Sequence, residues 1–173
     1  MHGTLEVGRG TGTPVICHCE SCTRAQRHFG VEANRTEGVA IFQTTPDKVS
    51  LDAGAEHLAL ARLSPKGSFR WYASCCNSQI GVSSTIPKFA FIGLVQSIFP
   101  DASALGRART HAYLQQPGGG EKHIRLMPAV LAVLSRSLSA LTSGRWRETP
   151  FFDVETGAPI APPEVLPKDA GRS

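Results

Sequence analysis

Three cysteines stand close together near the start of the 173-residue chain, at Cys17, Cys19 and Cys22. In an extended segment, residues two apart point to the same side, so the sulfurs of Cys17 and Cys19 can reach one point. A tight turn over Cys19-x-x-Cys22 would bring the third sulfur to that point. Because thiolates are preferred ligands of Zn²⁺, this spacing predicts three of the four ligands of a tetrahedral zinc site.

The fourth ligand decides what such a site can do. A fourth protein thiolate would close the site and make it structural, whereas an open position would admit water or a thiol and permit catalysis. The remaining cysteines, Cys75 and Cys76, are the candidates for closing the site. Both can hardly bind the same ion, because neighbouring side chains point apart in an extended backbone.

Two other interpretations of the cysteines compete with zinc. Cys19-x-x-Cys22 has the spacing of a thioredoxin-type redox motif, but no strand–helix–strand pattern surrounds it and Cys17 is left unexplained. A secreted disulfide framework needs an even number of cysteines and a higher density of them than the five in this chain. The first ten residues lack the apolar stretch of a signal peptide, so we expect a cytoplasmic protein.

The elements that must position the cysteines are mainly strands. Alternating or β-branched apolar residues predict strands over 39–45, 57–63, 68–73, 79–84, 89–95 and 110–115. Ser64-Pro-Lys-Gly67 has proline at the second and glycine at the fourth position of a type I turn. We therefore expect 57–63 and 68–73 to form a hairpin.

The hydrophobic period changes after the glycine run at 118–120. Apolar residues then recur every three or four positions, at Leu126, Val130, Val133, Leu134, Leu138 and Leu141. This spacing predicts an amphipathic helix, with Gly144 in the place of a C-cap. We expect its apolar stripe to pack on the core and not to face a membrane or a partner. Four prolines in the last 18 residues predict an extended tail.

The net charge of +4 is unevenly distributed along the chain. Between Arg107 and Arg147 there are seven basic residues and one acid, Glu121. Such a stretch could form a basic face for nucleic acid. Only Tyr113 and Trp146 are available there for base stacking, so we take it as a solvated surface and expect neither a nucleic acid nor a membrane partner.

Two motifs resemble those of a known family, the glutathione-dependent formaldehyde-activating enzyme (GFA) and centromere protein V family. Its members have a C-x-C-x-x-C motif, usually with His after the first cysteine, and later a motif close to F-C-x-x-C-G-x-x-L. Here the corresponding segments are Cys17-His-Cys-Glu-Ser-Cys22 and Phe69-Arg-Trp-Tyr-Ala-Ser-Cys-Cys-Asn-Ser-Gln-Ile80. The resemblance covers about residues 2 to 95, and within the family it is closest to an uncharacterised bacterial branch.

The resemblance implies a β-tent fold, in which small antiparallel sheets enclose zinc, here with a C-terminal amphipathic helix added. Together with the glycine run, the helical period and the prolines, it divides the chain into a zinc-binding β-tent domain at 1–117, a Gly-rich linker at 118–125, the helix at 126–147 and a Pro-rich tail at 148–173. The family also has a structural zinc site, whose early C-x-C pair is missing here. Of the later pair of that site only Cys76 remains, and His2 is a further candidate ligand of the remnant.

For function, the resemblance implies Zn²⁺ on Cys17, Cys19 and Cys22, with Cys76 as the candidate fourth ligand. A small thiol such as glutathione would be the partner, and the activity would be that of a carbon–sulfur lyase acting on S-hydroxymethylglutathione. His18, Glu20 and His28 are the candidate general bases, and Arg24 and Arg27 could attract an anionic thiol; for each, an ordinary surface position is the alternative. The alternative function is a non-catalytic zinc-stabilised β-tent module that docks an acidic partner or nucleic acid.

Overall fold

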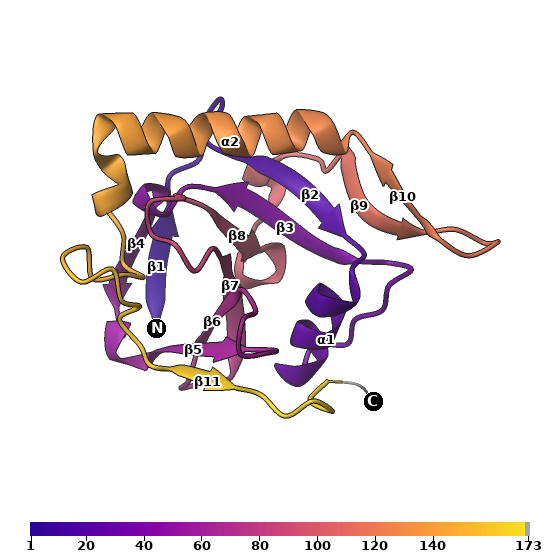
Figure 1. Ribbon diagram of the computed structural model, residues 1–173, viewed down its shortest axis with the longest axis horizontal. Helices are drawn as coiled ribbons and strands as arrows, with labels where there is room; N and C mark the ends of the chain where they lie inside the picture. Colours follow the sequence, from indigo (N-terminus) through magenta and orange to yellow (C-terminus); the bar gives the residue numbers. More distant parts are fainter. Residues whose placement is uncertain (172–173) are drawn as a thin grey trace.

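A computed structural model describes residues 1–171 of the chain, and this part is mainly β (Figure 1). The strands are β1 (His2–Leu5), β2 (Thr13–Cys17), β3 (Val39–Thr44), β4 (Val49–Ala53), β5 (Leu58–Arg62), β6 (Phe69–Ala73), β7 (Ser78–Ser83), β8 (Ile92–Val95), β9 (Thr110–Gln115), β10 (Glu121–Ile124) and β11 (Pro163–Val165). Two α-helices accompany them in the described chain, α1 (Glu20–His28) and α2 (Leu126–Ser143). The predicted mainly β fold with a C-terminal helix is confirmed.

Nine of these strands form one open sheet in the order β10-β9-β2-β3-β8-β7-β6-β5-β11. Most neighbours are antiparallel, whereas the β2–β9 and β11–β5 pairs are parallel. β1 and β4 form a separate antiparallel pair. β2 lies inside the large sheet, with the hydrogen-bonded strands β9 and β3 on either side. The sheet therefore fixes the position of the residue that ends β2, Cys17.

The predicted hairpin is formed by β5 and β6. Leu60 pairs with Trp71 across the two strands, and the Gly67 N–H donates to the Ser64 carbonyl at 2.9 Å, as a type I turn requires. Trp71 is fully buried and its indole N–H donates to Ser83 Oγ at 2.8 Å. This strand pair therefore carries the centre of the largest hydrophobic cluster.

The segment at 148–173, expected to be an extended tail, folds back onto the sheet. The Phe151 side chain is fully buried, and its ring centroid lies 5.1 Å from that of Trp71. Farther along, β11 pairs with β5, with Pro163 opposite Leu60. Burial of a phenylalanine stabilises a fold by about 1.5–3 kcal/mol, which favours packing of this segment on the sheet although part of it, β11, is extended.

The glycine run expected as a linker is the turn of a hairpin between β9 and β10. The Gln116 N–H donates to the Gly120 carbonyl at 3.2 Å, and Gly119 and Gly120 have φ values of 87° and 85° that favour glycine. Half of the range 118–125 is thus strand. The division of the chain into domains stays a prediction.

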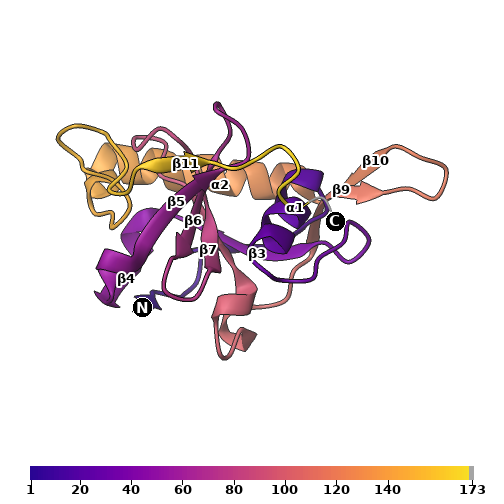
Figure 2. The ribbon, with the colours of Figure 1, turned by 90° about the horizontal axis from the view of Figure 1, so that it is seen from below.

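Helix α2 lies across β2 and β3, rotated so that only part of the expected apolar stripe faces inward (Figures 1 and 2). Its buried residues are Ala129, Ser137 and Ala140, whereas Leu131 and Leu138 are 59% and 61% exposed. The expectation that the apolar stripe packs on the core is therefore wrong for Leu138 and most of the stripe, although Leu126 packs against Val15 and Ala112. Small side chains allow the helix axis to lie close to the sheet, and this contact determines the inward face.

One helix in the described residues, α2, is long and apolar enough to cross a bilayer by length and composition alone. Its 18-residue window has a mean hydropathy of 1.4, and 17% of that window is buried. Several serines and Arg136 interrupt its apolar residues.

Candidate metal centre

The three clustered cysteines occupy the junction between β2 and α1. Cys17 is the last residue of β2, where it pairs with Val39 on β3 and Ala112 on β9. Cys19 is the N-cap of α1 in an extended conformation, and the Cys22 N–H donates to its carbonyl at 3.1 Å. The predicted tight turn is thus the first turn of a helix, and the sheet holds its starting point.

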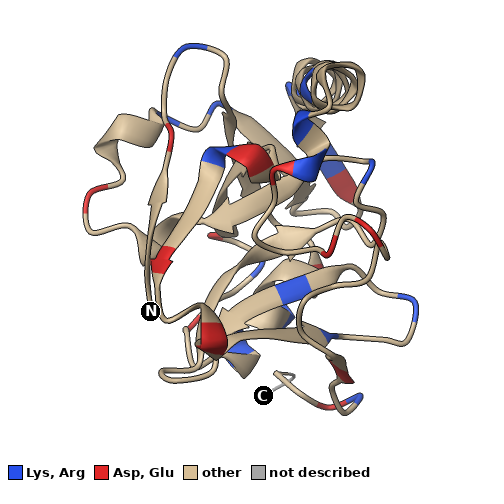
Figure 3. Ribbon diagram, turned by 90° about the vertical axis from the view of Figure 1, so that its left-hand side faces the viewer, with Lys and Arg blue, Asp and Glu red and all other residues tan. Residues whose placement is uncertain are grey.

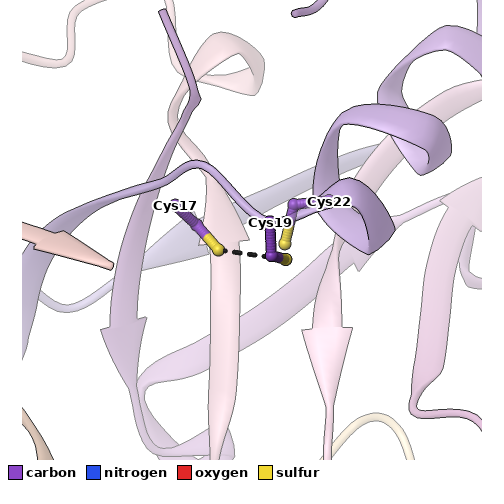
Figure 4. Close-up of side chains that lie close together, drawn as sticks. All are labelled: Cys17, Cys19 and Cys22. Carbon is purple, nitrogen blue, oxygen red and sulfur yellow. Dashed lines mark hydrogen bonds between the residues drawn. The ribbon is translucent and has the colours of Figure 1, made fainter. Parts of the chain in front are cut away.

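The sulfur atoms of the three residues converge (Figure 4). The sulfurs of Cys17 and Cys19 are 3.3 Å apart, and all three lie within 4.8 Å of one another. Around a tetrahedral zinc ion with Zn–S bonds of about 2.3 Å, sulfurs would be separated by about 3.8 Å. The cluster can therefore hold a metal ion with only small adjustments. Cys17 and Cys22 are buried, whereas Cys19 is partly exposed.

The three thiols differ in their tendency to lose a proton. Hydrogen bonds with Cys19 and Cys22, together with burial, raise the pKa of Cys17. The pKa of Cys19 is also raised: its hydrogen bond with Cys17 lowers it, but its contact with Cys22 and burial outweigh this. Hydrogen bonds from Cys17 and Cys19 hold the pKa of Cys22 well below its usual value, with Arg70 assisting and burial opposing. Cys22 is thus the thiol that most readily becomes a thiolate.

A buried arginine from a distant strand completes this arrangement. Arg70, in β6, is 5% exposed, and its Nη1 lies 3.9 Å from the Cys22 sulfur. Its Nη2 donates to Ser21 Oγ at 2.6 Å, which fixes the guanidinium against the start of α1. Sequence reasoning missed this residue. The only signal was a charged side chain between the large apolar residues Phe69 and Trp71.

His18, a candidate general base, has both ring nitrogens engaged and is 2% exposed. Its Nδ1 lies 2.8 Å from the Arg35 carbonyl, and its Nε2 lies 3.1 Å from Nδ1 of His111. A carbonyl only accepts, so Nδ1 of His18 carries a proton and donates to Arg35. His18 therefore joins the cysteine loop to β9 and is not free to accept a substrate proton. His28, the other candidate histidine, packs edge-on against Phe29.

The arginines that follow the cysteines hold the C-terminal segment. Arg24 donates to the carbonyls of Ala170 and Pro167 at 2.8 and 3.3 Å. Arg27 donates to the Gly171 carbonyl at 2.8 Å and pairs with Glu20 at 3.3 Å. Figure 2 shows this end of the chain beside α1. These contacts occupy the guanidinium groups that we expected to attract an anionic thiol.

The structure does not bring Cys76 into the three-sulfur cluster. Both Cys75 and Cys76 are exposed free thiols in the turn after β6, and the Cys76 sulfur lies 3.3 Å from Ser78 Oγ. Cys76 and His2 line a separate cavity of about 590 Å³. His2 also pairs with Asp52 at 3.3 Å. Among the His, Cys, Asp and Glu side chains of residues 1–171, the group that could hold a metal contains the three clustered cysteines alone.

The fold and this cluster define a mainly β protein with a three-cysteine group that can hold a metal ion. The chain belongs to the family of unknown function DUF6151, whose family model matches residues 1–161. No curated protein matches the chain. A crystal structure of a Rhodobacter sphaeroides protein is similar, with 16% identity, 61% of this chain and 87% of that chain covered, and a TM-score of 0.41.

Proposed function

We propose that the protein binds Zn²⁺ through Cys17, Cys19 and Cys22 and leaves a fourth position for a small thiol such as glutathione. The observation that carries this proposal is the convergence of three sulfurs within 4.8 Å, with no fourth His, Cys, Asp or Glu in the group among residues 1–171. Three protein ligands with one exchangeable position are the pattern of catalytic zinc sites, whereas four protein ligands are typical of structural ones.

The surroundings of the cysteines suit the binding of a thiolate. When bound, zinc would supply the positive charge that keeps a coordinating thiol deprotonated. Arg70 contributes a second, permanent positive charge on the buried side of Cys22. Because Cys17 and Cys22 are buried and Cys19 is partly exposed, an incoming thiol would approach from the side of Cys19.

The activity that we propose is that of a carbon–sulfur lyase, as the resemblance to the GFA family implies. In S-hydroxymethylglutathione, cleavage breaks the sulfur–carbon bond and leaves its electron pair on sulfur. The hydroxyl oxygen then loses its proton and becomes the carbonyl oxygen of formaldehyde. Since both nitrogens of His18 are engaged, we assign this proton to water at the exposed side of the cluster.

Metal content and activity test the two parts of this proposal separately. Plasma mass spectrometry of the reduced protein should find about one zinc per chain, lost in Cys17→Ser and retained in the matched control Cys75→Ser. Exchange NMR should then show faster formation and cleavage of the glutathione–formaldehyde adduct with the parent than with Cys17→Ser. Absence of zinc would overturn the whole proposal. Bound zinc without faster exchange would instead support the non-catalytic zinc module.

A further inference from the structure

A basic cavity lies beside α2, apart from the cysteine cluster. Its volume is about 300 Å³, and four cationic side chains from four segments line it: Arg9, Lys48, Arg136 and Arg145. The segments are the loop between β1 and β2, the short helix η1 (Pro46–Lys48), α2, and the short helix η5 (Arg145–Arg147). In Figure 3, basic segments gather beside the end of α2 together with an acidic one. None of the three clustered cysteines lines this cavity.

Nearby carboxylates balance only part of this charge. Arg145 Nη1 pairs with Asp47 Oδ2 at 2.8 Å, and Lys48 Nζ pairs with Glu6 Oε2 at 3.0 Å. Lys48 Nζ also lies 3.7 Å from the same Asp47 oxygen. Within residues 1–171, Arg9 and Arg136 take part in no ion pair. The four cations and two carboxylates therefore leave an excess of two positive charges.

Arg136 is held in place by neutral groups. Its Nη1 donates to Thr13 Oγ1 at 3.1 Å, and its Nη2 donates to the Gln43 carbonyl at 3.2 Å. Burial lowers the pKa of Arg136, which means that the surroundings disfavour its charge. A partly buried charge of this kind is stabilised when an opposite charge enters. The cavity thus holds a preoriented guanidinium without a carboxylate partner in the described chain.

One wall of the cavity is formed by Arg9, Gly10 and Thr11. These residues belong to the glycine-rich loop Gly8-Arg-Gly-Thr-Gly12. Gly10 has a φ of 83°, and a Cβ there would meet nothing within 4 Å, so the backbone is open to an approaching group. In the described chain, the N–H groups of Arg9 and Gly10 donate no hydrogen bond. Hydroxyl groups complete the lining, from Thr11, Thr45, Ser135 and Ser139. Backbone N–H groups of such loops, hydroxyls and arginines are the donors that bind phosphoryl oxygens.

We propose that this cavity is a binding site for a small phosphorylated compound, which it holds by its phosphoryl group. A phosphomonoester carries about −1.5 to −2 charges at neutral pH, which matches the two arginines that lack a carboxylate partner. The cavity, of about 300 Å³, is at the lower end of the range for small-ligand sites and leaves room for a short organic part. The site acts independently of the metal, so it stands whether or not the cysteines bind zinc.

Calorimetric titration with inorganic phosphate and with glycerol 3-phosphate, at constant ionic strength, tests this site. We expect saturable binding with a Kd of about 1 mM or tighter. Arg9→Gln should weaken it about tenfold or more, because one charge-assisted contact is lost. Arg107→Gln is the matched control, since it removes an exposed arginine that does not line the cavity. No binding by the parent, or equal weakening in both variants, would overturn the proposal.

Thermal unfolding and vesicle binding provide independent checks. Glycerol 3-phosphate should raise the Tm of the parent and of Arg107→Gln more than that of Arg9→Gln, because a ligand of the folded state stabilises it in proportion to its affinity. Arg9 lies in an exposed loop, so this variant avoids the structural contacts of Arg136. Vesicles of phosphatidylcholine with phosphatidic acid present the same phosphoryl chemistry on a lipid. Binding to these vesicles without any response to soluble phosphate compounds would also overturn the proposal.

Discussion

The guanidinium of Arg70 lies 3.9 Å from the sulfur of Cys22, although 48 positions separate the two residues. The arginine reaches the cysteine because the fold brings its side chain to the start of α1, where it also contacts Ser21. Its charge is buried, so water screens it little, and it favours the thiolate form of Cys22. A residue outside the cysteine motif thus helps to decide which of the three thiols is charged.

Replacement of Arg70 by methionine should raise the pKa of Cys22, because the buried opposite charge is removed. The rate of alkylation of the metal-free protein as a function of pH measures this change. Arg70→Lys keeps the charge and should preserve most of the low pKa. An unchanged pH profile in Arg70→Met would show that the hydrogen bonds from Cys17 and Cys19 suffice.

Metal binding should weaken as the pH falls. The pKa values of Cys17 and Cys19 are raised above the usual thiol value, so both are protonated near neutral pH in the metal-free cluster, whereas the lowered pKa of Cys22 favours its thiolate. Zinc binding should then release about two protons, and the affinity should rise about a hundredfold per pH unit. Competition with a chelating dye at several pH values measures the slope. A slope near three would mean that Cys22 is protonated as well.

The orientation of α2 predicts that substitutions at Leu138 and Ala140, on opposite sides of the helix, change the stability of the fold by different amounts. Leu138 is 61% exposed, so Leu138→Gln should change the free energy of unfolding by at most about 0.5 kcal/mol. Ala140 is fully buried in a cluster with Ala90 and Trp146, so Ala140→Leu should destabilise the fold by about 1–3 kcal/mol through overpacking. Urea denaturation compares the two variants. The reverse order would contradict the inward face described for this helix.

Phe151→Ala should strongly destabilise the protein, by about 3–5 kcal/mol, because it leaves a cavity beside Trp71. Ile160, which is 49% exposed in the same segment, offers the control Ile160→Ala. We expect that variant to lose far less stability in the same urea denaturation experiment. Similar small losses for both would mean that the segment after α2 contributes little to the core.

Local patterns were sufficient for the features that depend on neighbours in the chain. The Cys17-x-Cys-x-x-Cys22 spacing predicted convergent sulfurs because an extended pair and one tight turn require only about six residues. The β5–β6 hairpin was predictable for the same reason, since Ser64-Pro-Lys-Gly67 encodes its own turn. The spacing of apolar residues every three or four positions over 126–141 likewise identified a helix. The helix ends at Gly144, which is an αL C-cap.

The sequence by itself determined a mainly β chain, a C-terminal helix and a three-cysteine cluster suited to a metal. Only the tertiary structure decided that Arg70 contacts Cys22, that Cys76 lies apart from the cluster and that Arg24 and Arg27 hold the C-terminal segment. It also decided that α2 turns its small residues inward. Periodicity defines the faces of a helix but not the surface that each face meets. That choice depends on packing between segments that are far apart in the chain, which no local pattern records.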